Sequence, residues 1–307
     1  VQQSTGSYPQ TNISGVIDNF KASAFITVTS AGSDAANNNC KFQQRIEGSN
    51  VYDLAFGTVA AKKVTVSFYV KCSITGTFGI SLVNGSHNRS NVQTYTVNST
   101  STWERKIVTF NGDTSGSWDF GTGTGLQLMF DMGSGSNKLT NSTNQWLSAE
   151  YHGTTSSTKL IHTNGATMQY AGVQLEAGPV ATPFEFRNHG EELARCQRYF
   201  YVHLEGNNKP IGNGTYWTTS SVFCPVFFPV RMRTAPSAVF ANDGSNYWYG
   251  WFRDGTGNYE KGDNWSLAIS GEQGAEIYDP AASGTAGYSC FGRSQNASAK
   301  ITFSAEL

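Results

Sequence analysis

Short runs of alternating apolar and polar residues, separated by turns rich in glycine, recur along most of the chain. In residues 64–70, three valines and Phe68 fall on one face of an extended chain, while Thr65 and Ser67 fall on the other. No long stretch has helical spacing, and 33 glycines are available for turns. Strands at such regular intervals predict an all-β protein built from sandwiches, of which the jelly roll is one form.

Helical spacing appears once, over a short distance, between Gly190 and Phe200. Upstream of it, residues 168–175 alternate as a strand, and Gly178-Pro179 then interrupts that strand. Two glutamates follow Gly190, where a helix N-terminus favours negative charge, and apolar side chains recur after them at helical intervals. We therefore expect a short amphipathic helix that joins two β-rich bodies.

The predicted strands divide the chain into parts of unequal size. A length of 307 residues is sufficient for two domains with their own cores. We predict a polar N-terminal arm at 1–19 and a jelly-roll β-sandwich at 20–186. A linker with the short helix follows at 187–204, and a smaller β-sandwich occupies 205–307.

Composition excludes two classes of partner. Charged residues make up 14% of the chain and the formal net charge is −1, whereas a nucleic-acid binder needs a basic face. No apolar run approaches the roughly 20 residues that cross a bilayer, so we expect no membrane insertion. The five cysteines are scattered without a Cys-x-x-Cys pair, which predicts mostly buried free thiols in a protein made in a reducing cytoplasm.

The sequence GVQLEAGPVATPFEFRNHGEELARCQRYF, residues 172–200, closely resembles a junction motif of bacteriophage structural proteins, most of them tail-fibre or receptor-binding proteins. The resemblance covers most of the chain, through CKFQQRIEG (40–48), KVTVSFYV (63–70), GDTSGSW (112–118), FPVRMRTAP (228–236) and SAEL (304–307). It implies a component of the virion that is made in the host cytoplasm, forms a homotrimer and contacts other phage structural proteins.

The sequence contains few groups that suggest catalysis. It has no Gly-x-Ser-x-Gly elbow, no Walker-type loop and no His-Glu-x-x-His, and its five histidines are well separated. Scattered loop acids are more often solvated than catalytic, although a glycosidase would need two of them. The acids considered are Asp113, Asp119, Asp131, Glu150 and Glu176. We expect no enzyme activity, no cofactor and no metal, although some carbohydrate-binding modules, which a jelly roll of this kind resembles, hold a structural calcium.

Aromatic residues suggest a binding function, because sugar rings stack their apolar faces on exposed Trp and Tyr. The densest run places Tyr247, Tyr249 and Trp251 on one strand face, with Arg253 beside them as a polar partner. We predict a ligand site there. One face of the run must belong to the core, so a core and subunit-interface role is the alternative.

Two further tryptophans, Trp118 and Trp146, lie in polar loops, where a large aromatic needs an explanation. Sugar stacking, a loop anchor and a subunit contact all qualify, and Trp118 and Trp146 are included in the predicted ligand site. In the helix, Leu193, Gln197 and Phe200 have the spacing to pack at a trimer axis or on their own chain. We predict an oligomer interface at these three residues.

Together these observations predict a phage virion structural protein that binds a host-surface glycan through a fibre-type, non-catalytic site. The alternative is a capsid decoration or head-fibre protein whose aromatic surfaces contact the virion. A glycan depolymerase is the third hypothesis, and it would need two carboxylates facing each other across a groove.

Overall fold

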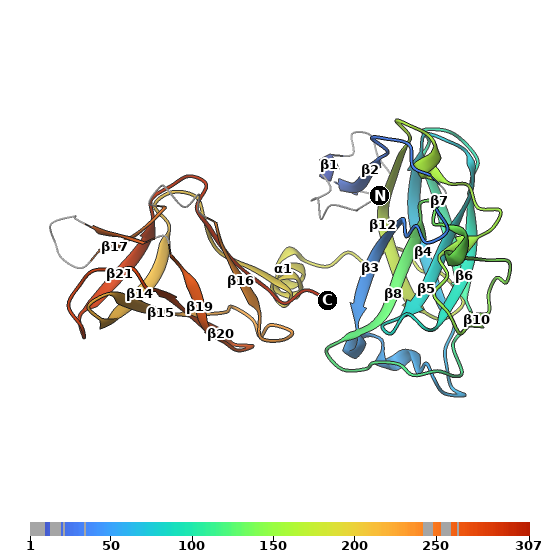
Figure 1. Cartoon of the computed structure of the whole chain (residues 1–307). Helices are drawn as coiled ribbons and strands as arrows, with labels where there is room; N and C mark the ends of the chain where they lie inside the picture. Colours follow the sequence, from blue (N-terminus) through green and yellow to red (C-terminus); the bar gives the residue numbers. More distant parts are fainter. Residues whose placement is uncertain are drawn as a thin grey trace. The chain divides into compact units, whose positions relative to one another are not determined.

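The computed structural model describes residues 10–12, 20, 22–33, 35–241, 248–252, 259–262 and 264–307. It divides into two compact units, Val1–Glu185 and Phe186–Leu307, each made almost entirely of β-strands (Figure 1). In the part of the chain that is described, the one α-helix is α1, His189–Gln197. The predicted all-β fold class is confirmed.

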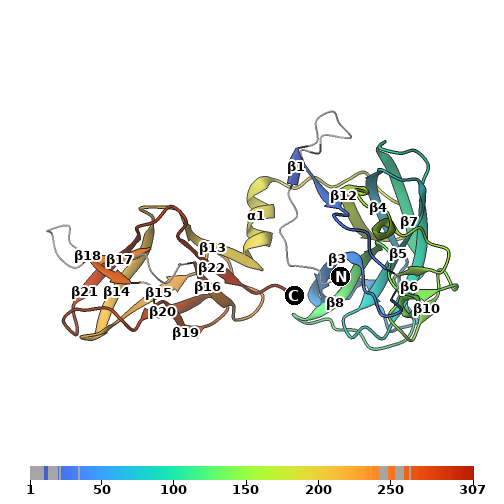
Figure 2. The same cartoon turned by 45° about the horizontal axis from the view of Figure 1, so that its top comes forward.

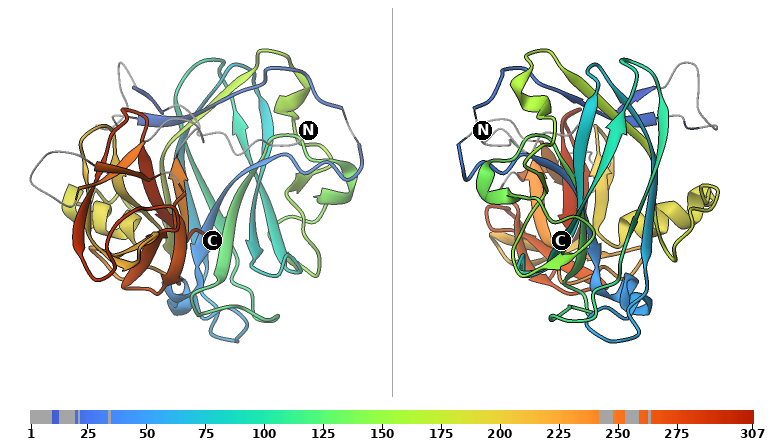
Figure 3. Two further views of the ribbon diagram at one scale, coloured as in Figure 1. Left: turned by 60° about the vertical axis from the view of Figure 1, so that its left-hand side comes forward. Right: turned by 90° about the vertical axis from the view of Figure 1, so that its right-hand side faces the viewer.

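The first unit is a sandwich of two five-stranded antiparallel sheets (Figure 3). One sheet has the order β1 (Gln10–Asn12), β2 (Ala22–Thr27), β12 (Thr167–Ala177), β4 (Val64–Cys72) and β7 (Glu104–Phe110). The other has the order β10 (Trp146–Leu147), β6 (Ser90–Val97), β5 (Gly76–Asn84), β8 (Thr124–Asp131) and β3 (Lys41–Glu47).

Short elements cover the ends and outer surface of this sandwich. Strands β9 (Leu139–Thr140) and β11 (Gly153–Thr154) form a small parallel pair. The 3₁₀ helices are η1 (Gly48–Asn50), η2 (Tyr52–Leu54), η3 (Ser136–Lys138) and η4 (Leu160–His162).

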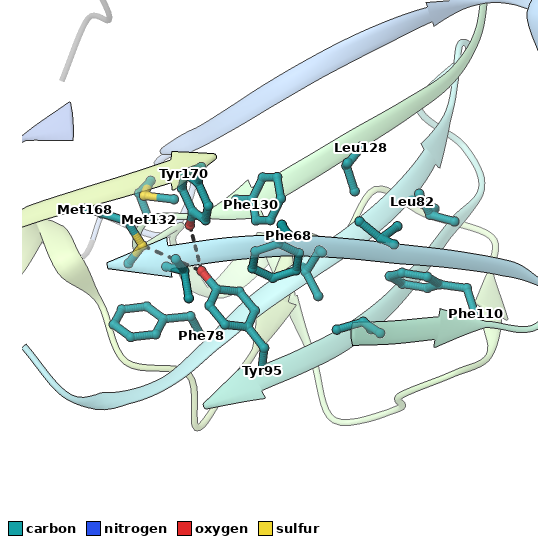
Figure 4. Packing of buried hydrophobic residues seen from close by; sticks show 14 of the residues in the cluster. Phe68, Phe78, Leu82, Tyr95, Phe110, Leu128, Phe130, Met132, Met168 and Tyr170 are labelled. Carbon is teal, nitrogen blue, oxygen red and sulfur yellow. Dashed lines mark hydrogen bonds between the residues drawn. The ribbon is translucent and has the colours of Figure 1, made fainter. Parts of the chain in front are cut away.

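Aromatic side chains from both sheets fill the space between them (Figure 4). Phe68 packs edge-on against Tyr95, with ring centroids 5.0 Å apart, and Phe130 lies 4.4 Å from Tyr170. The hydroxyl groups of Tyr95 and Tyr170 are 2.6 Å apart, so each buried phenol has a polar partner. Burial raises the pKa of both tyrosines, and they therefore stay neutral inside the core.

The second unit pairs a three-stranded with a seven-stranded sheet, both antiparallel (Figure 2). The smaller has the order β13 (Phe200–Glu205), β22 (Lys300–Ser304) and β16 (Ser237–Ala241). The larger has the order β18 (Tyr259–Gly262), β17 (Tyr249–Phe252), β21 (Ser289–Ser294), β14 (Pro210–Thr218), β15 (Ser221–Phe227), β20 (Gly274–Asp279) and β19 (Ser266–Ser270). Residues from both sheets, such as Trp251 and Phe303, share one core.

Strand β15 differs from the sequence-based expectation that prolines 225 and 229 make this segment an edge or kinked strand. It lies inside the sheet, between β14 and β20. Its pairing with β14 runs only from Ser221 to Phe223, whereas the pairing with β20 continues through Pro225. Proline is tolerated because it lies beyond the residues where β15 is paired with β14.

Helix α1 begins at His189, close to the predicted start, but it ends at Gln197, so Phe200, which was predicted to lie in the helix, is the first residue of β13. Asn188 caps it, since its side-chain oxygen accepts a hydrogen bond from the backbone N–H of Glu191 at 2.8 Å. Glu191 also pairs with Arg195 one turn later at 2.9 Å. None of the nine helical residues is buried in this chain.

Candidate ligand-binding surface

The seven-stranded sheet of the second unit carries a row of aromatic side chains on the face turned away from the core. In β15, Val222, Cys224 and Val226 are buried, so Phe223 and Phe227 point outward. The same alternation holds in β14, β20 and β21. We call the outward aromatics the aromatic face: Trp217, Phe223, Phe227, Phe252, Tyr278 and Phe291.

One half of the aromatic face is centred on three rings from adjacent strands. Phe223 and Tyr278 stand opposite each other in the β15–β20 pair and stack, with centroids 5.2 Å apart and planes 14° apart. Trp217 approaches Phe223 edge-on at 6.4 Å and is 75% exposed. A tryptophan this exposed offers a large flat surface to a ligand.

The other half consists of Phe252 and Phe291, which are cross-strand partners in β17 and β21. Their rings stack at 5.1 Å with planes 5° apart. The guanidinium of Arg293 lies over both rings, 5.5 Å from the centroid of Phe252 and 5.0 Å from that of Phe291. These distances are typical of cation–π contacts.

Polar side chains separate the two halves. Asn213 is the partner of Phe291, and Thr215 is the partner of both Ser289 and Phe223. Amide and hydroxyl groups therefore stand between flat rings on one exposed sheet. This combination suits a ligand with apolar faces and many hydroxyl groups.

The structure overturns part of the predicted site in this unit. Tyr249 and Trp251 are 0% exposed and belong to the core, so no ligand can stack on them. The hydroxyl of Tyr249 donates to the carbonyl of Ala241 at 2.7 Å, and the Trp251 ring lies 4.9 Å from Trp265. The prediction is wrong for these two residues because their strand turns this face inward and leaves Phe252 outside.

Tyr247 and Arg253, the other two predicted site residues of this run, lie outside the described residues. The aromatic face itself was missed by the sequence reasoning. Its signal was present in residues 221–227, where apolar side chains occupy both sides of a strand, as expected when one side is core and the other a binding surface.

In the first unit, the structure brings Trp118 and Trp146 together. Their ring centroids are 5.2 Å apart, and both pack edge-on against the buried Phe56, at 4.8 and 5.5 Å. The indole N–H of Trp146 donates to the carbonyl of Asn111 at 2.7 Å, and that of Trp118 donates to the carbonyl of Ser115 at 3.3 Å. Both rings are partly buried, and this geometry is that of a loop anchor.

A cleft of about 630 Å³ opens between the two sheets of the first unit. Core residues such as Leu128 and Phe130 line it, and the rings of Phe42 and Tyr170 stack within it at 5.7 Å. Polar groups at its wall come from Ser23 and the glutamines of β3. The lining of the cleft is mostly apolar.

The most concentrated set of charges is also in the first unit, around Glu150. Its carboxylate accepts hydrogen bonds from Lys41 at 2.9 Å and Lys138 at 2.5 Å, and lies 2.9 Å from His87 and 3.0 Å from His152. Burial would raise the pKa of Glu150, but the bonds from His152 and the two lysines hold that pKa well below its usual range. We call these five residues the Glu150 cluster.

The other acids considered as catalytic groups are engaged within the protein. Asp113 pairs with Arg89, and Asp131 accepts from the backbone N–H groups of residues 133 and 134. Asp119 accepts from the N–H of residue 121, and Glu176 binds Thr182. Each of these carboxylates stabilises a local turn or loop.

The described residues contain neither a candidate metal site nor a candidate membrane-spanning helix. No group of three or more His, Cys, Asp or Glu side chains there is placed to hold a metal ion. No helix in the described ranges is long and apolar enough to cross a membrane.

Comparisons with known proteins give weak likenesses only. No family model matches the chain, and no curated protein matches it. A CBM4 structure is 18% identical with a TM-score of 0.30, over 53% of this chain and 73% of its own. The CBM22-1–CBM22-2 tandem domain of Paenibacillus barcinonensis Xyn10C is 12% identical, with a TM-score of 0.25 over 96% and 90%.

Discoidin II of Dictyostelium discoideum is likewise 12% identical, with a TM-score of 0.19 over 96% of this chain and 87% of its own. At these TM-scores no argument about this chain rests on the likeness. The functional conclusion depends on its own residues, and the resemblance to phage fibre proteins stays a prediction.

Proposed function

We propose that this chain is a non-catalytic glycan-binding protein and that the aromatic face is its binding surface. The observation that carries the proposal is Trp217, which is exposed on a sheet beside the stacked rings of Phe223 and Tyr278. Contiguous exposed apolar surface with polar groups around it marks interaction sites in soluble proteins. Asn213 and Thr215 supply the hydrogen bonds that sugar hydroxyl groups require.

The shape of the surface favours a chain of sugars over a small isolated ligand. From Asn213 to Trp217 along β14 is four residues, or roughly 13 Å at about 3.3 Å per residue. The aromatic rings of the two halves therefore lie farther apart than the width of one sugar ring. A glycan with several units would contact both halves of the aromatic face together.

The phage assignment comes from the sequence resemblance, and within it we propose a fibre-type protein of the virion that binds host-surface glycan. We also propose a homotrimer. Helix α1 exposes Leu193, which is 46% accessible, and Gln197 at its end is partly buried. Phe200, the first residue of β13, is also exposed. An isolated nine-residue helix is marginal in water, so a neighbouring copy that covers this side would stabilise it.

A capsid decoration protein is the second candidate, and it has an observation of its own. Phe227 on the aromatic face is 80% exposed, and Ile269 and Tyr288 of the same unit are also well exposed. These side chains enlarge the apolar surface beyond what sugar stacking needs, as a protein–protein contact would.

Trp217→Ala tests the glycan proposal. Loss of one stacked ring is expected to weaken binding to the recognised members of a host-glycan array about tenfold, which corresponds to about 1.4 kcal/mol. Tyr52→Ala removes an equally exposed aromatic from the other unit and should leave binding unchanged. Equal affinity of the folded Trp217→Ala protein and the wild type would refute the proposal.

Leu193→Asp tests the homotrimer. A charge in a buried apolar contact is unfavourable, so we expect the mass measured by light scattering to fall from three chains to one. Glu192→Ala, a change at an exposed neighbouring position, should leave the mass unchanged. A wild-type protein that is already monomeric at micromolar concentration contradicts the trimer and leaves the glycan proposal standing.

A further inference from the structure

Arg293 is the cation of the aromatic face, and its position limits the ligand. It follows Phe291 by two residues in β21, so both side chains leave the sheet on the outer side. Its guanidinium lies over the rings of Phe252 and Phe291. Ring contacts hold the group in place and leave the N–H donors at its edge available to a ligand.

Among the described residues, the guanidinium of Arg293 differs from those of most other arginines because it donates no hydrogen bond to a protein oxygen. Arg89 pairs with Asp113, and Arg231 pairs with Glu272. Arg187 and Arg195 pair with helix glutamates, and Arg233 donates to backbone carbonyls at the end of the chain. In the described part of the structure, no carboxylate forms an ion pair with Arg293.

The strand register places Glu276, an outward acidic side chain of β20, far from Arg293. Asn213 on β14 is the cross-strand partner of Phe291 on β21. Thr215 on β14 pairs with Phe223 on β15, so Asn213 lies level with Pro225 on β15. Pro225 in turn pairs with Glu276 on β20. Three strand spacings of about 4.8 Å put Glu276 roughly 14 Å from Phe291. That exceeds the Debye length of about 8 Å at physiological salt, so Glu276 does little to offset the charge of Arg293.

A guanidinium presents parallel N–H donors that match the two oxygens of a carboxylate. We propose that the aromatic face takes a glycan containing an acidic sugar, whose carboxylate binds Arg293 while sugar rings stack on the neighbouring aromatics. This inference rests on the proposed function, and it adds that the bound glycan is negatively charged. Neutral glycans would gain the stacking contacts but would leave the guanidinium without an anion.

The test uses the full-length protein and pairs of oligosaccharides that differ only in a uronic-acid carboxylate against the neutral hexose. Wild type is expected to bind the acidic member at least tenfold more tightly, with a preference that weakens as salt rises. Arg293→Gln should abolish the preference, and Arg293→Lys should retain part of it because charge remains without the planar donor pair. Arg231→Gln, the same charge change off the face, should keep it in full.

The outcomes separate the two proposals. If acidic and neutral members bind equally well and Trp217→Ala weakens the binding of both, glycan binding stands and the acidic ligand class is refuted. If sulfated analogues of the same oligosaccharides, tested beside them, bind like the uronic acids and also depend on Arg293, the site recognises oxyanions in general and the carboxylate assignment is wrong. If no member binds, both proposals fail.

Discussion

Replacing Trp251 with alanine is expected to lower the unfolding free energy of the second unit by about 3–5 kcal/mol. The side chain is fully buried, packs on Trp265 with centroids 4.9 Å apart, and lies against two strand glycines. A Cβ added at Gly214 or Gly292 would stand 3.0 or 2.9 Å from Cζ3 of Trp251. The two glycines thus leave the space that this ring occupies, and removal of the ring leaves a cavity that the strands cannot close easily.

Scanning calorimetry of the full chain measures this effect, with Trp217→Ala as the matched control. The control removes the same side chain from an exposed position, so its stability should change by less than about 0.5 kcal/mol. The transition of the first unit should stay in place in both variants. If the unfolding free energy of Trp251→Ala lay within about 1 kcal/mol of the wild-type value, the assignment of this residue to the core would be contradicted.

The pair also separates stability from binding. Trp251→Ala should lose ligand binding only to the extent that the second unit unfolds, whereas Trp217→Ala should weaken binding about tenfold while the unit stays folded. A single substitution that reduced binding would not distinguish the two, because a site substitution lowers the affinity and a core substitution lowers the amount of folded protein.

The alternation of apolar and polar residues predicted the strands well, but it did not show which faces of a strand are covered by the rest of the protein. In β4, Val64, Val66 and Phe68 are fully buried, as their period of two indicates. Thr65 and Ser67 are buried too, although the pattern placed them on a solvent face. The hydroxyl of Thr65 donates to the carbonyl of Gly178 at 2.7 Å, so a distant segment covers this side. Sequence spacing along one strand carries no information about such a cover.

The same limit explains the misplaced binding site. The aromatic run in β17 shows that two faces exist, but the choice between them depends on which face the three-stranded sheet covers. Trp251 faces Gly292, and Phe252 faces Phe291. Only the strand register shows that the glycine side is the core and the phenylalanine side is the surface.

The Glu150 cluster is likewise assembled from positions that are far apart in sequence. Lys41 comes from β3, and His87 comes from the loop between β5 and β6. Lys138 and His152 belong to the long polar segment between β8 and β12. In the sequence, Glu150 is one of several scattered loop acids and the two histidines are well separated, because nothing in their spacing indicates that they converge.

Glu150→Gln is expected to lower the unfolding free energy of the first unit by about 3–5 kcal/mol, as when one partner of a buried ion pair is removed. Glu150 is 11% exposed and Lys41 is 10% exposed, so the lysine would stay buried without its counter-charge. Asp53→Asn removes a carboxylate from the exposed pair with Lys62, and should cost no more than about 1 kcal/mol.

The cluster also predicts how stability depends on pH. Burial, with a smaller contribution from Lys41, lowers the pKa of His152 below its usual 6.5, against the opposing effect of Glu150 and Asp131. The folded protein therefore takes up this proton less readily than the unfolded chain, and stability falls as pH drops below about 6.5. The pKa of Glu150 is also lowered, from 4.5, so its contribution is lost as pH drops further.

Both groups act in the same direction, each at up to about 1.4 kcal/mol per pH unit within its own window. The first unit should therefore unfold at progressively lower urea concentration from pH 6.5 downward. Asp53→Asn should follow the wild-type curve closely. Glu150→Gln should have a shallower slope below about pH 4.5, because the variant lacks the contribution of the Glu150 carboxylate. A wild-type curve that is flat between pH 7 and 4 would show that His152 and Glu150 are not buried together as the structure places them.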